Sequence, residues 1–214
     1  MTQEADTNKT RKRAPQERAE VTKKLLLEAA IRQFSERGYD AVTLREIELD
    51  AGVQRNLLKY HFGSKENIWT LAAQSLINHQ GIFLASRMDV IKDLSVHERV
   101  AFTIRSYVRF CSEHPEFHRL MAQEGKQASW RMNWLVDNHL LPAMKNLRET
   151  VEDDIGITDD EFVNWYYMYV ASGAFIFAMA PEVERMFGVN PQDEQLIERH
   201  ANMMVDFLLS RADK

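Results

Sequence analysis

The sequence predicts an all-helical protein, with a small N-terminal head of three helices and a larger C-terminal helical body. Three observations support this prediction. Apolar residues recur at helical spacing, strand-like alternation is absent, and Gly or Pro residues divide the body into segments of helical length. With 214 residues, 45% of them hydrophobic, the chain can form one large and one small domain. We expect a flexible basic arm at residues 1–15, a helix-turn-helix domain of the homeodomain type at 16–64, and the body at 65–214.

The N-terminal arm is polar and basic. It contains Lys9 and the run Arg11-Lys12-Arg13 and ends at Pro15, a composition typical of disorder. Such a segment can enter a DNA minor groove or can be a plain solvated tail. The apolar pattern that follows, from Glu17 to Arg37, predicts one long helix that ends at Gly38.

Two short helices with a glycine turn between them are predicted from Thr43 onward. Thr43 is expected to cap the first helix, with Glu46 reaching back to complete a capping box. That helix is expected to stop before Gly52, which can adopt the left-handed backbone conformation of a tight turn. The second helix, Arg55–Phe62, is too short to be stable by itself.

The second short helix carries hydrogen-bonding side chains on the faces that Leu57 and Leu58 leave free. Arg suits guanine edges, Gln and Asn suit adenine, and Lys, Tyr and His suit phosphates. This pattern fits a recognition helix in a DNA major groove, and it fits equally an ordinary helical hairpin with a solvated polar face. The side chains are Gln54, Arg55, Asn56, Lys59, Tyr60 and His61.

The body is predicted to be a series of helices. Ser64 is expected to cap a helix that runs from Lys65 to about Arg87 and joins the head to the body. Pro142 is expected to kink the helix that contains it, and residues 178–191 are expected to connect the last two helices. The other expected helices span residues 96–113, 115–124, 129–153, 159–179 and 193–211.

Charge is distributed unevenly along the chain. Residues 1–65 contain 13 Lys and Arg against 10 Asp and Glu, whereas the remainder contains 14 against 22. A mildly basic head on an acidic body is expected to turn the head toward DNA. The sequence has no long apolar run, no signal-peptide pattern at its start, and a single cysteine, Cys111. We therefore expect a cytoplasmic protein with no membrane partner.

The last two predicted helices are candidates for self-association, because each has a wide apolar face. Two such helices from each subunit could form a four-helix interface, although the same periodicity is equally compatible with residues of an ordinary core. The expected interface residues are Phe162, Val170, Gly173, Ala174, Phe177, Ile197, Ala201, Met204, Val205 and Leu208.

The central helices, between residues 102 and 179, are rich in aromatic residues and Met with polar groups among them. A mostly apolar cavity with a few polar anchors is what a small-molecule site requires. The expected ligand-binding residues are Ser106, Phe110, Met121, Trp134, Asn138, Tyr166 and Tyr169. The run Cys111-x2-His114-x3-His118 lacks an obvious fourth ligand, so neither a metal nor a cofactor is expected. Phosphate-binding loops and nucleophile elbows are absent, and no enzyme activity is expected.

The head contains an ordered set of short motifs. They lie at Leu26–Phe34 (LLEAAIRQF), Gly38-Tyr39, Thr43-Leu44, Ile47, Ala51-Gly52-Val53, Leu58, Tyr60-His61-Phe62 and Ser64-Lys65-Glu66. Each motif is weak alone, but the set is specific in its order and spacing. From Thr22 to Trp69 the chain resembles the DNA-binding domain of the TetR family of bacterial transcriptional regulators.

The resemblance implies a ligand-responsive repressor that binds a palindromic operator as a homodimer through its last two helices. A small, largely apolar effector would tilt the helix at 65–87 and release the operator. The alternatives are an activator or co-regulator with the same head, and a ligand-binding dimer that has lost DNA affinity. The residues expected at phosphates, bases or the DNA backbone are Thr43, Arg45, Gln54, Arg55, Asn56, Lys59, Tyr60, His61 and Lys65.

The chain departs from the family pattern at three positions in the head. Gln54 stands where Ser or Thr usually caps the recognition helix, and it is a poorer cap. Lys59 stands where an aromatic residue is common. Glu48 replaces the usual small residue after Ile47 and is expected on the exposed side of the first short helix. The operator sequence therefore does not follow from the resemblance.

Overall fold

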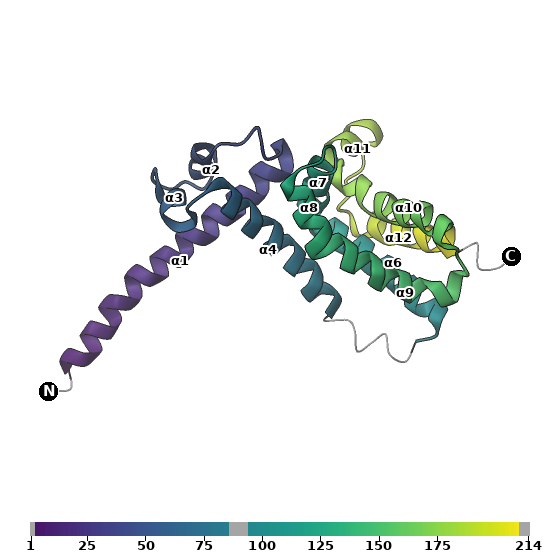
Figure 1. Cartoon of the computed structure of the whole chain (residues 1–214), viewed down its shortest axis with the longest axis horizontal. Coiled ribbons are helices and arrows are strands. Elements are labelled where there is room, and N and C mark those ends of the chain that lie inside the picture. Colours follow the sequence, from purple (N-terminus) through teal and green to yellow (C-terminus); the bar gives the residue numbers. More distant parts are fainter. Residues whose placement is uncertain (1–2, 86–93, 210–214) are drawn as a thin grey trace. The chain divides into compact units, whose positions relative to one another are not determined.

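The computed structural model describes residues 3–85 and 94–209, and its regular elements in these ranges are all helical (Figure 1). The all-helical prediction is confirmed for this part of the chain. The chain divides into two compact units, one containing residues up to Gln74 and the other beginning at Ser75. Among the described helices, none combines the length and the apolarity needed to cross a bilayer.

The first unit contains three helices, α1 (Gln3–Arg37), α2 (Leu44–Asp50) and α3 (Leu57–Phe62), and the first part of α4 (Lys65–Ala85). Helix α1 packs against both short helices, which also pack against each other. The three-helix head expected from the sequence is therefore present. Its buried apolar side chains are Leu26, Ala29, Ala30, Phe34, Val42, Ile47, Leu58 and Phe62.

Helix α1 begins at Gln3, well before the expected start at Glu17. Residues 3–15, which the sequence predicted as a flexible arm, are therefore helical in the structure. Gln, Glu, Ala, Lys and Arg dominate this stretch, and all have high helix propensity. Disorder was predicted because these residues offer little apolar surface, but their helix propensity favours extension of α1. A role for the segment at DNA stays a prediction.

The start of α4 belongs to the head. Ser64 caps the helix, with its hydroxyl accepting the N–H of Asn67 at 3.1 Å, as predicted. The Asn67 amide donates to the backbone carbonyl of Phe62 at 2.8 Å, and the Tyr39 hydroxyl donates to Glu66 at 3.1 Å. These contacts explain why the division between the units falls inside α4 and not before Lys65, where the sequence placed it.

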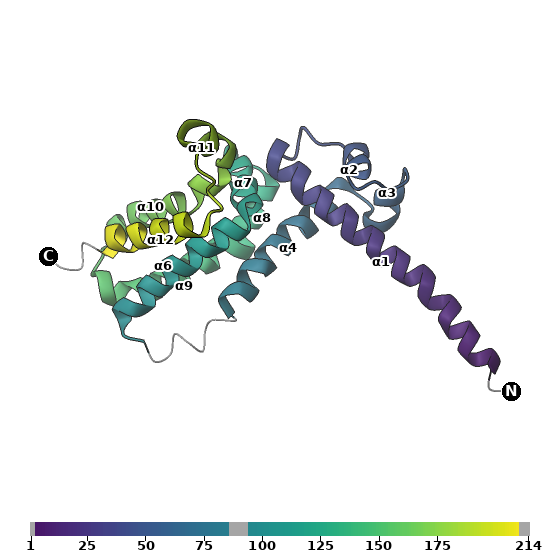
Figure 2. The same ribbon diagram turned by 180° about the vertical axis from the view of Figure 1, so that it is seen from behind.

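The second unit is organised around helix α6 (Val96–Glu113), which packs against α9, α10 and α12. Figure 2 shows α10 and α12 side by side next to α6. The predicted bounds 96–113 and 115–124 are confirmed by α6 and α7. The remaining helices are α7 (Pro115–Glu124), α8 (Trp130–Leu135), α9 (Leu141–Ile155), α10 (Asp159–Ala178), α11 (Ala180–Phe187) and α12 (Glu194–Leu209).

The helix expected at 129–153 is interrupted. A π-helical segment, η1 (Val136–Leu140), separates α8 from α9, so the irregularity precedes Pro142 instead of occurring as a simple kink. Proline has no N–H to donate and its ring crowds the preceding turn, and a wider turn accommodates both effects. Pro142 then lies in the first turn of α9, where its missing donor costs little.

Residues 178–191, expected as a connection, contain the short helix α11. Pro181 lies in its first turn and Gly188, with φ of 67°, ends it in the left-handed conformation. Both residues were expected only to bound a connection, whereas together they are the start and stop signals of a helix.

The core of the second unit contains a stack of aromatic rings. The Tyr107 and Tyr169 rings lie 4.4 Å apart between centroids, and Trp165 stacks on Tyr169 at 5.5 Å. The Tyr107 hydroxyl donates to the backbone carbonyl of Val170 at 3.3 Å. Gly173 gives the Tyr107 ring its space, because a Cβ at this position would lie 2.7 Å from two ring carbons.

We predict that Gly173→Ala destabilises the protein by about 1–3 kcal/mol, because the added methyl group overlaps a packed ring. Gly81→Ala is the matched control, since it adds the same methyl group to helix α4 at a point with no atom within 4 Å. That change should stabilise the protein by about 0.5–1 kcal/mol through the lower chain entropy of Ala. Urea unfolding followed by circular dichroism measures both effects. Equal stability of the two variants would contradict the close contact at Gly173.

Candidate nucleic-acid interface

Helix α2 begins with the capping box that the sequence predicted. The Thr43 hydroxyl accepts the N–H of Glu46 at 3.2 Å, and the Glu46 carboxylate accepts the N–H of Thr43 at 2.7 Å. The Thr43 hydroxyl also donates to Glu46, and this bond, the Thr43 N–H and the Arg37 guanidinium lower the pKa of Glu46 to about 2. Both ends of the box and the Arg37 contact fix Thr43 at the surface of the head.

The turn after α2 depends on Gly52. Its φ of 65° is left-handed, its N–H donates to Leu49 at 3.1 Å, and the N–H of Val53 donates to Glu48 at 3.0 Å. These two bonds form a Schellman motif, which reverses the chain at the end of a helix. The predicted role of Gly52 is confirmed.

Helix α3 begins at Leu57, two residues after the predicted start at Arg55. Arg55 and Gln54 therefore lie in the turn before the helix. Leu58 and Phe62 are buried on the inner side of α3, while Lys59 and Tyr60 are exposed, the latter with 81% of its surface accessible. The helix has the buried and polar faces that a recognition helix needs.

Asn56 precedes α3 in an unusual conformation. Its φ is 70°, and it is the described non-glycine residue with a left-handed backbone. Its side chain makes no capping hydrogen bond to α3. Asn tolerates this region better than most residues, but the helix then has to find another acceptor for its first N–H groups.

Glu48 is that acceptor, and its expected position on the exposed side of α2 is wrong. Only 4% of the residue is accessible, and its carboxylate accepts the N–H of Leu58 at 3.2 Å. The other carboxylate oxygen lies 3.4 Å from the guanidinium of Arg45. The helical spacing from Leu44 and Ile47 places Glu48 on the buried side of α2. Its charge was the reason to expect it in solvent.

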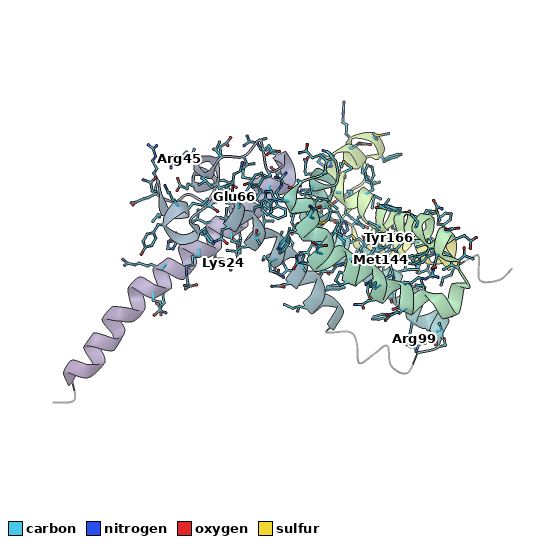
Figure 3. All side chains as sticks on the ribbon, in the orientation of Figure 1. Lys24, Arg45, Glu66, Arg99, Met144 and Tyr166 are labelled. Atoms are coloured by element: carbon cyan, nitrogen blue, oxygen red, sulfur yellow. The ribbon has the colours of Figure 1, made fainter. Side chains whose placement is uncertain are left out.

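The expected DNA-contacting residues all lie at the surface of the head. Arg45 is labelled in Figure 3, where it projects from α2. His61 is half-buried, with its ring 4.9 Å from that of Tyr60, and the Lys65 ammonium lies 4.2 Å from the centroid of the Tyr39 ring. The exposed members of the set are Thr43, Arg45, Gln54, Arg55, Asn56, Lys59 and Tyr60, and the half-buried members are His61 and Lys65.

The expected ligand-binding residues differ in burial, and their role at a ligand stays a prediction. Ser106, Phe110 and Tyr169 are buried, whereas Asn138 is exposed and donates to the backbone carbonyl of Trp134 at 2.8 Å. Met121, Trp134 and Tyr166 are half-buried. A shallow groove between α6 and α12 includes none of them, and it is lined by Leu94, His97, Glu98, Ala101, Phe102, Arg105 and Val205.

The body buries two polar pairs, one of which joins two members of the run Cys111-x2-His114-x3-His118. Glu124 and Arg131 form an ion pair of 2.7 Å, and both are almost fully buried. The Cys111 sulfur lies 3.2 Å from Nε2 of His118. Burial, with a smaller effect of His139, lowers the pKa of His118 to about 4, and burial raises the pKa of Cys111. The part of the chain that the structure describes contains no group of three or more His, Cys, Asp or Glu suited to a metal ion.

The residues expected at a dimer interface lie inside the body. Val170 is half-buried, and the other nine are buried in their own chain, so they are core residues and not surface residues. Helices α10 and α12 are apolar on more than one side, and periodicity selected the side that packs on α6. The exposed apolar residues of these two helices include Val163, Tyr167, Phe175, Met203 and Phe207.

Comparisons with known proteins agree with this architecture. Residues 26–69 match the family model described as bacterial regulatory proteins, tetR family. Over 120 residues the chain is 32% identical to the HTH-type transcriptional repressor NicS of Pseudomonas putida. This match covers 55% of the chain and 54% of NicS, so the chain spans about half the length of this curated relative.

Two solved structures share the fold over most of their length. A TetR-like transcriptional regulator from Rhodococcus sp. RHA1 is 15% identical with a TM-score of 0.64, over 87% of this chain and 93% of that chain. FadR from Bacillus subtilis, solved in complex with stearoyl-CoA, is 16% identical with a TM-score of 0.61, over 87% and 97%.

A helix-turn-helix head followed by a separate helical body defines a class of two-domain helix-turn-helix proteins. The head matches the model of one family within this class, and 87% of the chain shares its fold with a TetR-like transcriptional regulator. Residues 26–69 of the head are therefore similar to the tetR family of bacterial regulatory proteins.

We predict that the capping box makes the stability of the head depend on pH. The pKa of Glu46 falls from its usual 4.5 to about 2 in the folded protein. The stabilisation that the Glu46 carboxylate provides is therefore fully present above the unfolded pKa of 4.5 and is lost as the pH falls through the folded pKa of about 2. Urea unfolding at several pH values should show the stability difference between wild type and Glu46→Gln shrinking as the pH falls through this range.

The control for the capping box is Glu28→Gln, whose carboxylate lies 3.9 Å from Lys24 on the exposed surface of α1. Exposed pairs of this kind contribute little to stability. A difference for Glu46→Gln that stays constant with pH, or that matches the control, would contradict the role of the capping box.

Proposed function

We propose that this protein is a DNA-binding transcriptional repressor that recognises a palindromic operator as a homodimer and responds to a small-molecule effector. The observation that carries the proposal is the division of α3 into two faces. Leu58 and Phe62 are buried on its inner face, and Lys59 and Tyr60 are exposed on its outer face. Arg55 and Arg45 lie exposed on the turn before α3 and on the neighbouring helix α2.

The chemistry of this surface matches duplex DNA. Cationic side chains neutralise phosphates and release counterions, while Arg, Asn and Gln can pair with base edges in the major groove. The residues available for base edges are Gln54, Arg55 and Asn56, at the start of α3, where helix-turn-helix proteins make their base contacts. The net charge of −5 does not oppose this, since the head carries the excess of cations.

The size of α3 supports a dimer. Six residues make a helix about 9 Å long, which can read only a few base pairs. Two copies related by a two-fold axis read two half-sites spaced by one turn of the double helix, roughly 34 Å. A palindromic operator is the sequence that matches this symmetry.

The surface proposed for dimerisation is the exposed apolar face of α10 and α12. Val163, Tyr167 and Phe175 recur at helical spacing on α10, and Met203 and Phe207 lie four residues apart on α12. The two helices pack side by side, so these residues belong to neighbouring elements. Large apolar side chains gathered on one face are typical of subunit interfaces.

The effector proposed is small and largely apolar. The body is rich in aromatic side chains around α6, where Phe110 contacts Phe83, Phe117 and His118. FadR, which shares the fold, holds an acyl-CoA. Such a ligand releases the operator only if it binds the DNA-free state more tightly than the DNA-bound state. The name of NicS, a repressor, favours repression over activation.

We predict that Arg55→Ala and Lys59→Ala weaken operator binding while leaving the protein folded and dimeric. An arginine that pairs with a guanine should account for about 1–3 kcal/mol, and loss of a lysine at a phosphate should lower the salt slope by about one. The operator can be obtained by selection from random duplexes, and fluorescence anisotropy at several salt concentrations measures both effects.

Lys145→Ala, which removes an exposed cation from α9 in the body, serves as the control for operator binding. Unchanged affinity for both head variants would remove the assignment of α3 as the recognition helix. Binding that is insensitive to salt would contradict recognition of DNA altogether.

We predict that the double change Met203→Asp and Phe207→Asp produces a folded monomer. Each places a carboxylate on the apolar face proposed for dimerisation, where burial of a charge in the dimer is unfavourable. Ile82→Asp is the matched control, because Ile82 on α4 is as exposed as Met203, 68% against 69%. Sedimentation velocity measures the oligomeric state. A dimeric double variant would show that the interface lies elsewhere.

A further inference from the structure

The start of helix α3 has no local cap. A helix leaves its first N–H groups without intrahelical acceptors, and the residue before the helix usually supplies a side-chain oxygen. Asn56 does not do so in this chain, since its backbone is left-handed and its side chain makes no cap bond. A helix of six residues has few internal hydrogen bonds to compensate.

The missing acceptor comes from the neighbouring helix. Glu48 on α2 points its carboxylate to the N–H of Leu58, the second residue of α3, at 3.2 Å. The residue is nearly fully buried, and a negative charge at the N-terminal end of a helix is favourable. The backbone carbonyl of Glu48 accepts the N–H of Val53 in the turn. The same residue therefore holds both the turn and the helix that follows it.

The second oxygen of this carboxylate contacts a cation at the surface of the head. It lies 3.4 Å from the guanidinium of Arg45, whose side chain is about half exposed. One buried carboxylate thus connects the beginning of α3 to a surface cation on α2. Sequences with a small residue at this position cannot make either contact.

We infer that Glu48 is a positioning residue for DNA recognition, which sets the orientation of α3 and of the Arg45 guanidinium relative to each other. This inference rests on the proposed function. Base readout requires side chains placed to within about 0.5 Å, because bidentate hydrogen bonds to base edges are directional. A shift of α3 at its first turn moves Arg55 and Asn56, which lie closest to the anchored end. Glu48 therefore governs which sequence is bound, and not only how tightly.

Three variants separate the two contacts of the carboxylate. Glu48→Ala removes both, Glu48→Gln keeps an amide oxygen for Leu58 and loses the charge opposite Arg45, and Arg45→Ala keeps the bond to Leu58. Asp50→Ala is the matched control. It removes one carboxylate from the same helix and breaks an ion pair with Arg32 at 3.1 Å, but it leaves α3 untouched.

Two measurements on the full chain test the inference. Hydrogen exchange of the Leu58 amide, in the absence of DNA, reports the bond from α2 to α3. Selection of bound duplexes from a random pool, followed by anisotropy titration on the wild-type operator, reports sequence preference and affinity. A plain loss of stability lowers the amount of active protein but leaves the preferred sequence unchanged.

We expect Glu48→Ala to speed exchange at Leu58 and to weaken operator binding by roughly tenfold, the effect of losing a helix cap. Its selected sequences should differ from those of the wild type within each half-site. Glu48→Gln should keep the slow exchange, and its loss of affinity should be smaller than that of Arg45→Ala, which removes the guanidinium itself. Asp50→Ala should retain the wild-type exchange at Leu58 and the wild-type sequence preference.

The positioning role is overturned if Glu48→Ala and Asp50→Ala select the same sequences as the wild type. It is also overturned if the Leu58 amide exchanges as slowly in Glu48→Ala as in the wild type and the other three variants. If Glu48→Ala does not fold, Glu48→Gln decides, because a preference identical to that of the wild type excludes a role for the contact with Arg45. Failure of the wild-type protein to bind any duplex in a salt-dependent way would reject the proposed function itself, a result distinct from the other two.

Discussion

A helix of six residues cannot keep its shape in water through its own hydrogen bonds, and this constraint shapes the whole head. Helix α3 persists because its neighbours supply what it lacks. Leu58 and Phe62 are buried against the head, Gly52 reverses the chain before it, and a carboxylate from α2 accepts the N–H of its second residue. The exposed side chains on its outer face, such as Lys59 and Tyr60, are not needed for packing and are available for recognition.

In the body, the constraint is the packing of helices that have apolar residues on more than one side. Helix α6 takes the central position, and the aromatic stack of Tyr107, Tyr169 and Trp165 fills the space beside it. Gly173 is required there because a ring occupies the volume of a side chain. Once this core is complete, α10 and α12 still expose large apolar residues, and these supply the face that a second subunit can cover.

Much of the head could be predicted from local signals. The capping box at Thr43, the turn at Gly52 and the cap at Ser64 depend on residues close in sequence, so their chemistry can be read without coordinates. In the body, Ser95 and Pro115 start helices in the same local way, and the bounds of α6 and α7 followed from such signals. The helical state of residues 3–15 and helix α11 were missed, because propensity and start signals were given less weight than polarity and breakers.

The sequence by itself determined the helical class, the order of the elements and the polar set around α3, since periodicity, caps and turns act over a few residues. Tertiary structure alone decided which faces are inside. Glu48 was expected in solvent but is buried, because the acceptor it provides is needed ten residues later in the chain. Phe177 and Met204 were expected at a surface but lie in the core, because a helix that is apolar on two sides does not record which side meets its own chain. Whether a residue is buried depends on the helix that packs against it, and that helix is formed by residues distant in the sequence.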